Sequence, residues 1–194
     1  MQAPACQQSQ KLRAEVGATG ALLGARLAPQ LRQLFLQCFG ALLAHQLLAH
    51  ALGGEVAYNP AGRESGTIEL ELQPQAAQDP LFQGLPQHFA AHATHLQTVL
   101  RAPDGAEVLA RSPLDGCHAF RWGRQAWGVQ FHPEFATHHM RGYVRARADC
   151  IGRHGGCARS IERAVSAAPL ARQLLRRFVR QARLSSAQPA AKQG

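Results

Sequence analysis

The chain has 194 residues and a formal net charge of +9, and its charged residues make up only 17% of the sequence. This length allows one domain with a proper hydrophobic core. The chain has no apolar run that could span a membrane, and residues 1–35 lack the continuous apolar stretch of a signal peptide. Five scattered cysteines without a disulfide-like spacing favour a reducing compartment. We therefore expect a cytoplasmic globular protein.

The first half of the chain predicts a lead-in, a helix and a strand. Residues 1–33 show weak periodicity and are expected to form a divergent, poorly ordered lead-in. Residues 41–52 are good helix formers, and the glycine pair that follows suits the end of a helix. In residues 66–72, apolar residues alternate with glutamates, which is typical of a half-buried strand. Shorter strands are expected at 89–92, 96–100, 106–111, 117–121 and 126–131.

Helices are predicted over 137–148 and 168–183, followed by a disordered tail at 184–194. Strands flanked by helices fit an α/β layer architecture with a partly antiparallel insertion. We expect residues 34–183 to form one domain.

The positive charge is concentrated in residues 141–194, which carry twelve Lys and Arg residues against two acidic ones. Such a segment could bind nucleic acid or an acidic surface. However, Leu170, Leu174 and Phe178 recur at helical spacing and form an apolar stripe. We therefore favour a helix docked on the core, with Arg172, Arg176 and Arg183 in water, over nucleic-acid binding.

The tripeptide His132-Pro133-Glu134 is the strongest candidate for chemistry, since it directly follows a run of strand character, residues 127–131. Residues two apart on an extended segment point to the same face, and the proline favours an extended backbone at the histidine. An imidazole held by a carboxylate can serve as a base toward a nucleophile from elsewhere in the fold. We therefore predict contact between His132 and Glu134 at the carboxyl edge of a sheet.

The string WGVQFHPEF resembles the carboxy-terminal signature of class I glutamine amidotransferases, in particular the stand-alone, GMP-synthase-like group. The string HQLLAHALGG, at 45–54, is similar to the helix that follows the nucleophile in that family. Further similarity lies at 59–67, 79–82 and 92–99. The resemblance implies a flavodoxin-like fold, an open and mostly parallel sheet with helices on both faces.

The same resemblance implies a Cys-His-Glu mechanism that hydrolyses glutamine to glutamate and ammonia. His132 would be the general base and acid, Glu134 would hold its tautomer, and Cys38 would be the nucleophile. Gln46 and His95 would lie near the substrate. We expect a synthetase on another chain to accept the ammonia, no membrane partner, no cofactor and no metal; the spacing of Cys150, His154 and Cys157 fits no standard zinc pattern.

The position of the nucleophile has two alternatives. In one register Cys38-Phe39-Gly40 is the nucleophile segment, and residues 41–44 are an insertion before His45-Gln46. In the other register residues 40–46 match the motif without a gap, which places Leu42 at the nucleophile position. Leucine cannot attack an amide. The second register therefore favours a different hypothesis, a catalytically inactive amidotransferase-like binding or regulatory protein.

The region before the nucleophile is short for this family. Three strands and two helices with ordinary connections need about 60 residues or more, whereas 37 residues precede Cys38. No glycine loop of the kind that would supply the first oxyanion donor occurs before Leu34. We therefore expect the fold to be incomplete, truncated or diverged, on its N-terminal side.

Overall fold

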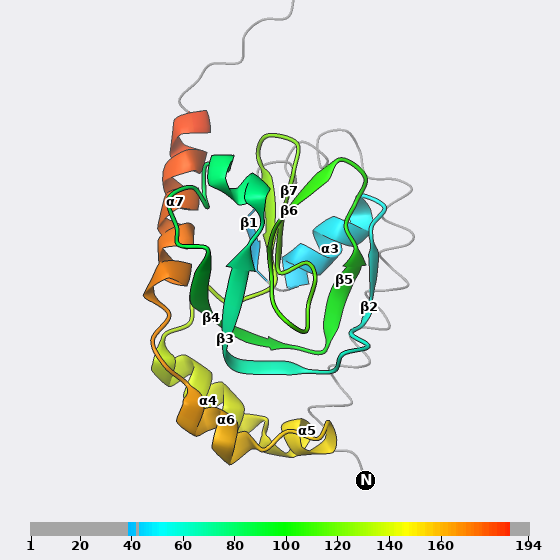
Figure 1. The fold of residues 1–194 in the computed structure, drawn as a ribbon, viewed down its shortest axis with the longest axis vertical. Coiled ribbons are helices and arrows are strands. Elements are labelled where there is room, and N and C mark those ends of the chain that lie inside the picture. The colour runs from blue at the N-terminus through cyan, green and yellow to red at the C-terminus, as the bar shows by residue number, and fades with distance from the viewer. Residues whose placement is uncertain (1–38, 42, 187–194) are drawn as a thin grey trace, which may run out of the picture.

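The computed structural model describes residues 39–41 and 43–186, which form a mixed α/β arrangement (Figure 1). A run of strands is flanked by helices along the chain, as the sequence predicts. In order they are β1 (Phe39–Ala41), α3 (Leu43–Ala51), β2 (Glu55–Tyr58), β3 (Glu64–Leu72), the 3-10 helix η1 (Pro74–Gln78), β4 (His88–His95), β5 (Gln97–Arg101), β6 (Ala106–Arg111), β7 (Ala119–Trp122), β8 (Ala126–Val129), α4 (Thr137–Ala146), α5 (Ala148–Arg153), α6 (Ala158–Ala164) and α7 (Pro169–Ser186).

Six of these strands form one sheet in the order β1-β8-β7-β6-β3-β4, and β2 pairs with β5 separately. The pair β1–β8 is parallel, with Ala41 opposite Val129, and the other pairs among the described strands are antiparallel. The predicted α/β class is confirmed, but the antiparallel part is larger than the expected insertion. Short connections cause this, because a link such as 123–125 between β7 and β8 can join only antiparallel strands.

Helices cover both faces of the sheet, as predicted (Figure 1). Alternate residues of a strand point to opposite faces. On β8, Trp127 and Val129 join the core cluster that packs against α7, whereas Ala126 joins the cluster that packs against α3. Between them, Gly128 allows α3 to approach closely, because a Cβ atom there would lie 2.7 Å from Nδ1 of His45.

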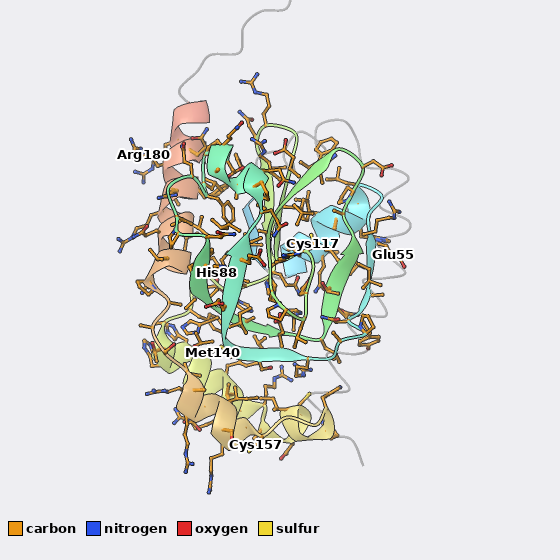
Figure 2. The ribbon with its side chains drawn as sticks, in the orientation of Figure 1. Glu55, His88, Cys117, Met140, Cys157 and Arg180 are labelled. Carbon is orange, nitrogen blue, oxygen red and sulfur yellow. The ribbon has the colours of Figure 1, made fainter. Side chains whose placement is uncertain are left out.

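The basic helix α7 docks on the core through the predicted apolar stripe. Leu174 is fully buried, Leu170 and Phe178 are partly buried, and Figure 2 shows Arg180 projecting outward. The predicted exposure of three arginines on this helix is also confirmed: Arg172, Arg176 and Arg183. In addition, Arg177 donates hydrogen bonds of 2.7 Å to the carbonyl groups of Leu81 and Gln83.

The boundaries differ from the predictions at several places. The helix α7 continues to Ser186, beyond the expected end at residue 183. The strand β2 and the short helices α5 and α6 were not predicted, since segments of four to seven residues carry too little periodicity. The expected lead-in at 1–33 lies outside the described residues. No helix in the described part is long and apolar enough to cross a membrane.

Candidate functional site

His132 and Glu134 are in contact, as predicted, but a turn at Pro133 and Glu134 brings them together instead of an extended segment. The Nδ1 atom of His132 lies 2.7 Å from Oε1 of Glu134, three positions beyond the end of β8. A carboxylate can only accept a hydrogen bond, so Nδ1 carries the proton and neutral His132 keeps a lone pair on Nε2. Nε2 is buried and has no hydrogen-bond partner among the described residues. This is the tautomer that a general base needs.

His132 is held by three neighbouring groups. The backbone N–H of His132 donates to the carbonyl of His92 on β4, at 2.7 Å. The Phe135 ring stacks on the imidazole, with centroids 4.3 Å apart and planes inclined by 17°. The imidazole is therefore held between a strand, an aromatic ring and a carboxylate, which orients Nε2.

Electrostatics keep the partner carboxylate ionised. Partial burial of Glu134 favours its neutral form, but the hydrogen bond from His132 outweighs burial and lowers the pKa of Glu134. Burial, together with the nearby charge of His132, lowers the pKa of His92. Glu134 remains partly open to water, since 45% of its side chain is exposed. The pair therefore lies at the surface end of the sheet.

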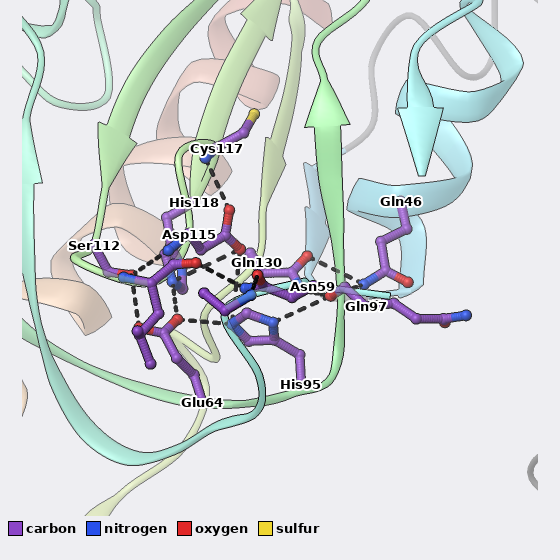
Figure 3. Close-up of polar contacts among 12 residues, drawn as sticks. Gln46, Asn59, Glu64, His95, Gln97, Ser112, Asp115, Cys117, His118 and Gln130 are labelled. Carbon is purple, nitrogen blue, oxygen red and sulfur yellow. Dashed lines mark hydrogen bonds and ion pairs between the residues drawn. The ribbon is translucent and has the colours of Figure 1, made fainter. Parts of the chain in front are cut away.

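Gln46 and His95, the two predicted substrate-binding residues, meet at one backbone carbonyl. The side-chain amide of Gln46 donates to the carbonyl oxygen of Gln97 at 2.9 Å, and Nδ1 of His95 lies 3.1 Å from the same oxygen. The amide of Gln130, two positions before His132, donates to this oxygen as well, at 2.8 Å. Gln46 on α3 is therefore linked to the segment that leads to His132 (Figure 3).

His95 itself is buried in a polar cluster. Its Nε2 atom lies 3.0 Å from Oε2 of Glu64, and Nε2 of His118 lies 2.6 Å from the same oxygen. Burial opposes ionisation of Glu64, but hydrogen bonds from His118, His95 and Ser112 hold the pKa of Glu64 far below its ordinary value. A substrate-binding role for His95 stays a prediction, because its ring is turned into this cluster.

Sequence reasoning did not identify Glu64, Asp115 and His118 as members of one site. They come from β3 and from the loop before β7, and no spacing motif links them. The register of β3 with β4 places Glu64 opposite His95, and this pairing is a tertiary contact that the sequence does not display.

The nucleophile position is not decided by the described residues, since Cys38 and Leu42 both lie outside them. The strand β1 ends at Ala41 and α3 begins at Leu43. Because β1 and β8 are parallel, their carboxyl ends lie side by side, so this strand-to-helix transition adjoins the segment that leads to His132. Both registers therefore remain predictions.

Comparison with known sequences gives the family. Residues 19–147 match the family described as glutamine amidotransferase class-I. This chain belongs to that family. The match covers α3, every described strand, and the dyad His132–Glu134. It ends before α5, α6 and α7.

Curated relatives of this amidotransferase-family chain include GMP synthases. The GMP synthase of Aeropyrum pernix is 40% identical over 122 residues, which cover 61% of this chain and 23% of that protein. A glutamine-hydrolyzing GMP synthase subunit from Methanothermobacter thermautotrophicus is 37% identical over 112 residues, 57% of each chain. The chain thus spans less than two thirds of the length of either relative.

Solved structures of amidotransferases show the same fold. A glutamine amidotransferase from Thermotoga maritima matches with a TM-score of 0.67 and 21% identity, over 94% of this chain and 74% of that one. A glutamine amidotransferase from Methylobacillus flagellatus matches with a TM-score of 0.60 and 22% identity, over 100% of this chain and 74% of that one. At these identities the likeness concerns the fold alone, which is the flavodoxin-like fold that the resemblance implies.

Proposed function

We propose that this chain is a glutaminase domain in which Cys38 is the nucleophile, His132 the general base and acid, and Glu134 the group that orients His132. The observation that carries the proposal is the 2.7 Å contact between His132 and Glu134, which leaves Nε2 without a hydrogen-bond partner in residues 45–183. The parallel pairing of β1 with β8 supports it, because the nucleophile segment and the dyad then lie at the same edge of the sheet.

The proposed reaction has two steps. His132 takes the proton of the thiol, and the thiolate attacks the side-chain carbonyl carbon of glutamine. Collapse of the tetrahedral intermediate breaks the C–N bond, His132 returns the proton to the leaving nitrogen, and ammonia departs from a glutamyl thioester. Water, deprotonated by His132, then cleaves the thioester to give glutamate and the free thiol. The sum is glutamine plus water to glutamate plus ammonia.

The partner in this proposal is an ammonia-accepting synthetase on another chain. Several relatives are named as single subunits of GMP synthase, which implies that a further polypeptide completes those enzymes. We propose the same division for this chain, with a synthetase of the GMP synthase kind as acceptor.

A second candidate function is a binding or regulatory module without catalysis. It is favoured by one observation, that the strand-to-helix pair β1–α3 contains no cysteine from Phe39 to Ala51. If the nucleophile position lies within this pair, no thiolate is available. Since misplacement of a reacting group by about 1 Å can lower a rate by 10²-fold, we expect weak or absent turnover from the chain alone.

One experiment separates the two candidates. Purified protein is assayed for ammonia release from glutamine, and a glutamine analogue with an electrophilic group is followed by mass spectrometry. Label on Cys38 that disappears in Cys38→Ser supports the glutaminase. Cys157→Ser is the matched control, because Cys157 is exposed and hydrogen bonds from Ser160 lower its pKa, which makes it prone to non-specific labelling. A folded protein without label on Cys38 favours the inactive module.

A further inference from the structure

Four buried side chains converge at the cluster around Glu64, and they come from three separate parts of the chain. His95, His118, Glu64 and Asp115 each contribute one possible ligand atom, and these four atoms all lie within 4.8 Å of one another. Figure 3 shows these atoms turned toward a common centre. Their residues are all buried. Two carboxylates and two imidazoles in such a place need a positive charge to balance them.

No lysine or arginine of the described residues supplies that balance. Across residues 45–183, the ion pairs of Glu64 and Asp115 are with His95 and His118 alone, and no Arg or Lys pairs with either carboxylate. The Oδ2 atom of Asp115 is buried and has no hydrogen-bond partner in the described part of the chain, although it points into the cluster. An unpaired buried carboxylate oxygen is unfavourable unless a cation completes it.

The tautomer of His95 indicates that a cation belongs between its ring and Glu64. Nδ1 of His95 faces the carbonyl oxygen of Gln97, so Nδ1 carries a proton. In the neutral ring, Nε2 then has a lone pair, and this lone pair faces Oε2 of Glu64 at 3.0 Å. Two acceptors do not face each other without a positive charge between them. That charge is either a second proton on His95 or a metal ion.

The surrounding contacts favour the metal ion. In three of the four side chains, the polar atom that faces away from the centre is held by its own hydrogen bond. Oε1 of Glu64 accepts from Ser112 at 2.6 Å, and Oδ1 of Asp115 accepts from the N–H of Cys117 at 2.9 Å. Nδ1 of His95 donates to the carbonyl oxygen of Gln97. Supporting bonds of this kind orient the ligands of metal sites and leave the other atom free to coordinate.

We propose that Glu64, His95, Asp115 and His118 form a structural site for one divalent transition-metal ion of the zinc class. Two imidazoles and two carboxylates suit Zn²⁺ rather than Mg²⁺ or Ca²⁺. Four ligands at about 2.0–2.2 Å in a tetrahedron are about 3.3 Å apart. The measured separations of 2.6, 3.0, 3.8 and 3.9 Å lie on both sides of that value. An ion with four protein ligands has no open position for a substrate or water, so the role of the ion would be structural.

The position of the site explains what the ion would hold together. Glu64 begins β3, His95 ends β4, and Asp115 and His118 lie between β6 and β7. The ion would therefore fasten the loop 112–118 to the β3–β4 hairpin. A pocket of about 440 Å³, lined in part by Ser112 and Asp115, opens beside the cluster and offers a route of entry.

The direct test is metal binding by the full chain, purified without an affinity tag. Chelator-treated protein is incubated with Zn²⁺, passed through gel filtration and analysed for metal content. We expect one zinc ion per chain and a rise in the unfolding midpoint of about 5–10 °C at a hundredfold excess over Kd. Co²⁺ in place of Zn²⁺ should give the visible absorption of a four-coordinate ion.

Two variants and one control locate the bound ion. Asp115→Asn and His118→Gln keep the approximate size of the side chain, the former with an oxygen that can accept from the N–H of Cys117 and the latter with an amide that can donate to Glu64. Each should weaken zinc binding on the order of 10²-fold or more. His88→Gln is the matched control, because His88 is an exposed histidine on β4, and it should leave binding unchanged (Figure 2). A zinc ion retained equally by both cluster variants overturns the proposal, as does a wild-type chain that retains none.

Crystals of the wild-type protein soaked in Zn²⁺ test the proposed zinc site even if the variants do not fold. An anomalous difference peak between the four ligand atoms supports the site, and a peak elsewhere, or none, overturns it. No step depends on glutamine hydrolysis, so failure of this proposal is distinct from failure of the glutaminase.

Discussion

Two imidazole–carboxylate groups on the same sheet differ in how much of each ring is free. In the dyad, His132 uses Nδ1 to bind Glu134, while Nε2 has no partner among the residues that the structure describes, and the carboxylate is 45% exposed. In the cluster around Glu64, both nitrogens of His95 are engaged, and the carboxylate is only 4% exposed. The same two chemical groups thus form an open pair in one place and a closed one in the other.

The difference shows that a histidine beside an acid is not in itself a sign of catalysis. A base must have one nitrogen free and must reach a substrate. A buried pair whose atoms are all engaged contributes to the fold instead, and removal of one member leaves the others unpaired. The comparison predicts that changes at the dyad affect rate, whereas changes at the cluster affect stability.

The largest expected effect is on rate. His132→Ala should lower any ammonia release from glutamine by about 10²–10⁴-fold, because general acid–base catalysis contributes about that much. The measurement is a coupled ammonia assay on protein with a normal melting temperature. A matched change, His88→Gln, should leave the rate unaltered, since His88 is exposed on β4. Equal rates for His132→Ala and wild type would break the assignment of the dyad.

The largest effect on stability is expected at Glu64. Glu64→Ala should lower the free energy of unfolding by about 3–5 kcal/mol, because His95, His118 and Ser112 each lose a buried partner. Urea denaturation measures it. Glu71→Ala is the control on the same strand: Glu71 pairs with Arg111 at the surface, and its removal should cost at most about 1 kcal/mol. Similar losses of stability in both variants would contradict the distinction between the buried cluster and a surface ion pair.

Acid should destabilise the protein through a third histidine, His45, which is fully buried. Burial lowers the pKa of His45 to about 4 from 6.5. The folded state therefore binds fewer protons than the unfolded state between these values, and stability falls as pH falls through that window, by about 3 kcal/mol in total. Unfolding curves at pH 7 and pH 4 measure the loss. His45→Leu should remove this loss, so that its free energies of unfolding at pH 7 and pH 4 differ by about 3 kcal/mol less than those of the wild type. If the variant loses as much stability between pH 7 and pH 4 as the wild type, His45 is not the cause.

The smallest expected effect is on the stability contributed by the dyad. Glu134→Gln should change the free energy of unfolding by less than about 1 kcal/mol, because partly exposed ion pairs contribute little. Its rate should fall, since the amide no longer stabilises a charged His132. A loss as large as that expected for Glu64→Ala would mean that the dyad is mainly a structural pair.

The sequence predicted the parts of the fold that carry local patterns. The alternation in β3, the apolar stripe of α7 and the contact between His132 and Glu134 are each a property of a short segment, and all three are found. The extended backbone expected for the tripeptide is wrong, because Pro133 and Glu134 lie in a turn closed by the bond from the N–H of Phe135 to the carbonyl of His132. The family resemblance supplied the fold class, which periodicity alone did not. Segments of few residues, such as β2 and α6, lacked enough turns or alternations to be recognised.

The cluster around Glu64 could not be predicted in the same way. It depends on the register between β3 and β4 and on the path of the loop 112–118, which are long-range properties. Asp115 and His118 follow a proline and a glycine in a segment that reads only as a turn. The residues of such a site become neighbours through tertiary structure, and their spacing in the sequence carries no signal.

The contact between α7 and the turn at 79–83 has a practical consequence for dividing the chain. The family match stops at residue 147, yet Leu174 is fully buried and Arg177 bonds two carbonyl groups of that turn. A fragment cut at the end of the match would expose Trp127 and Leu81, which belong to the core cluster under α7. The smallest unit that folds independently should therefore extend through Ser186, and shorter fragments should aggregate through that uncovered face.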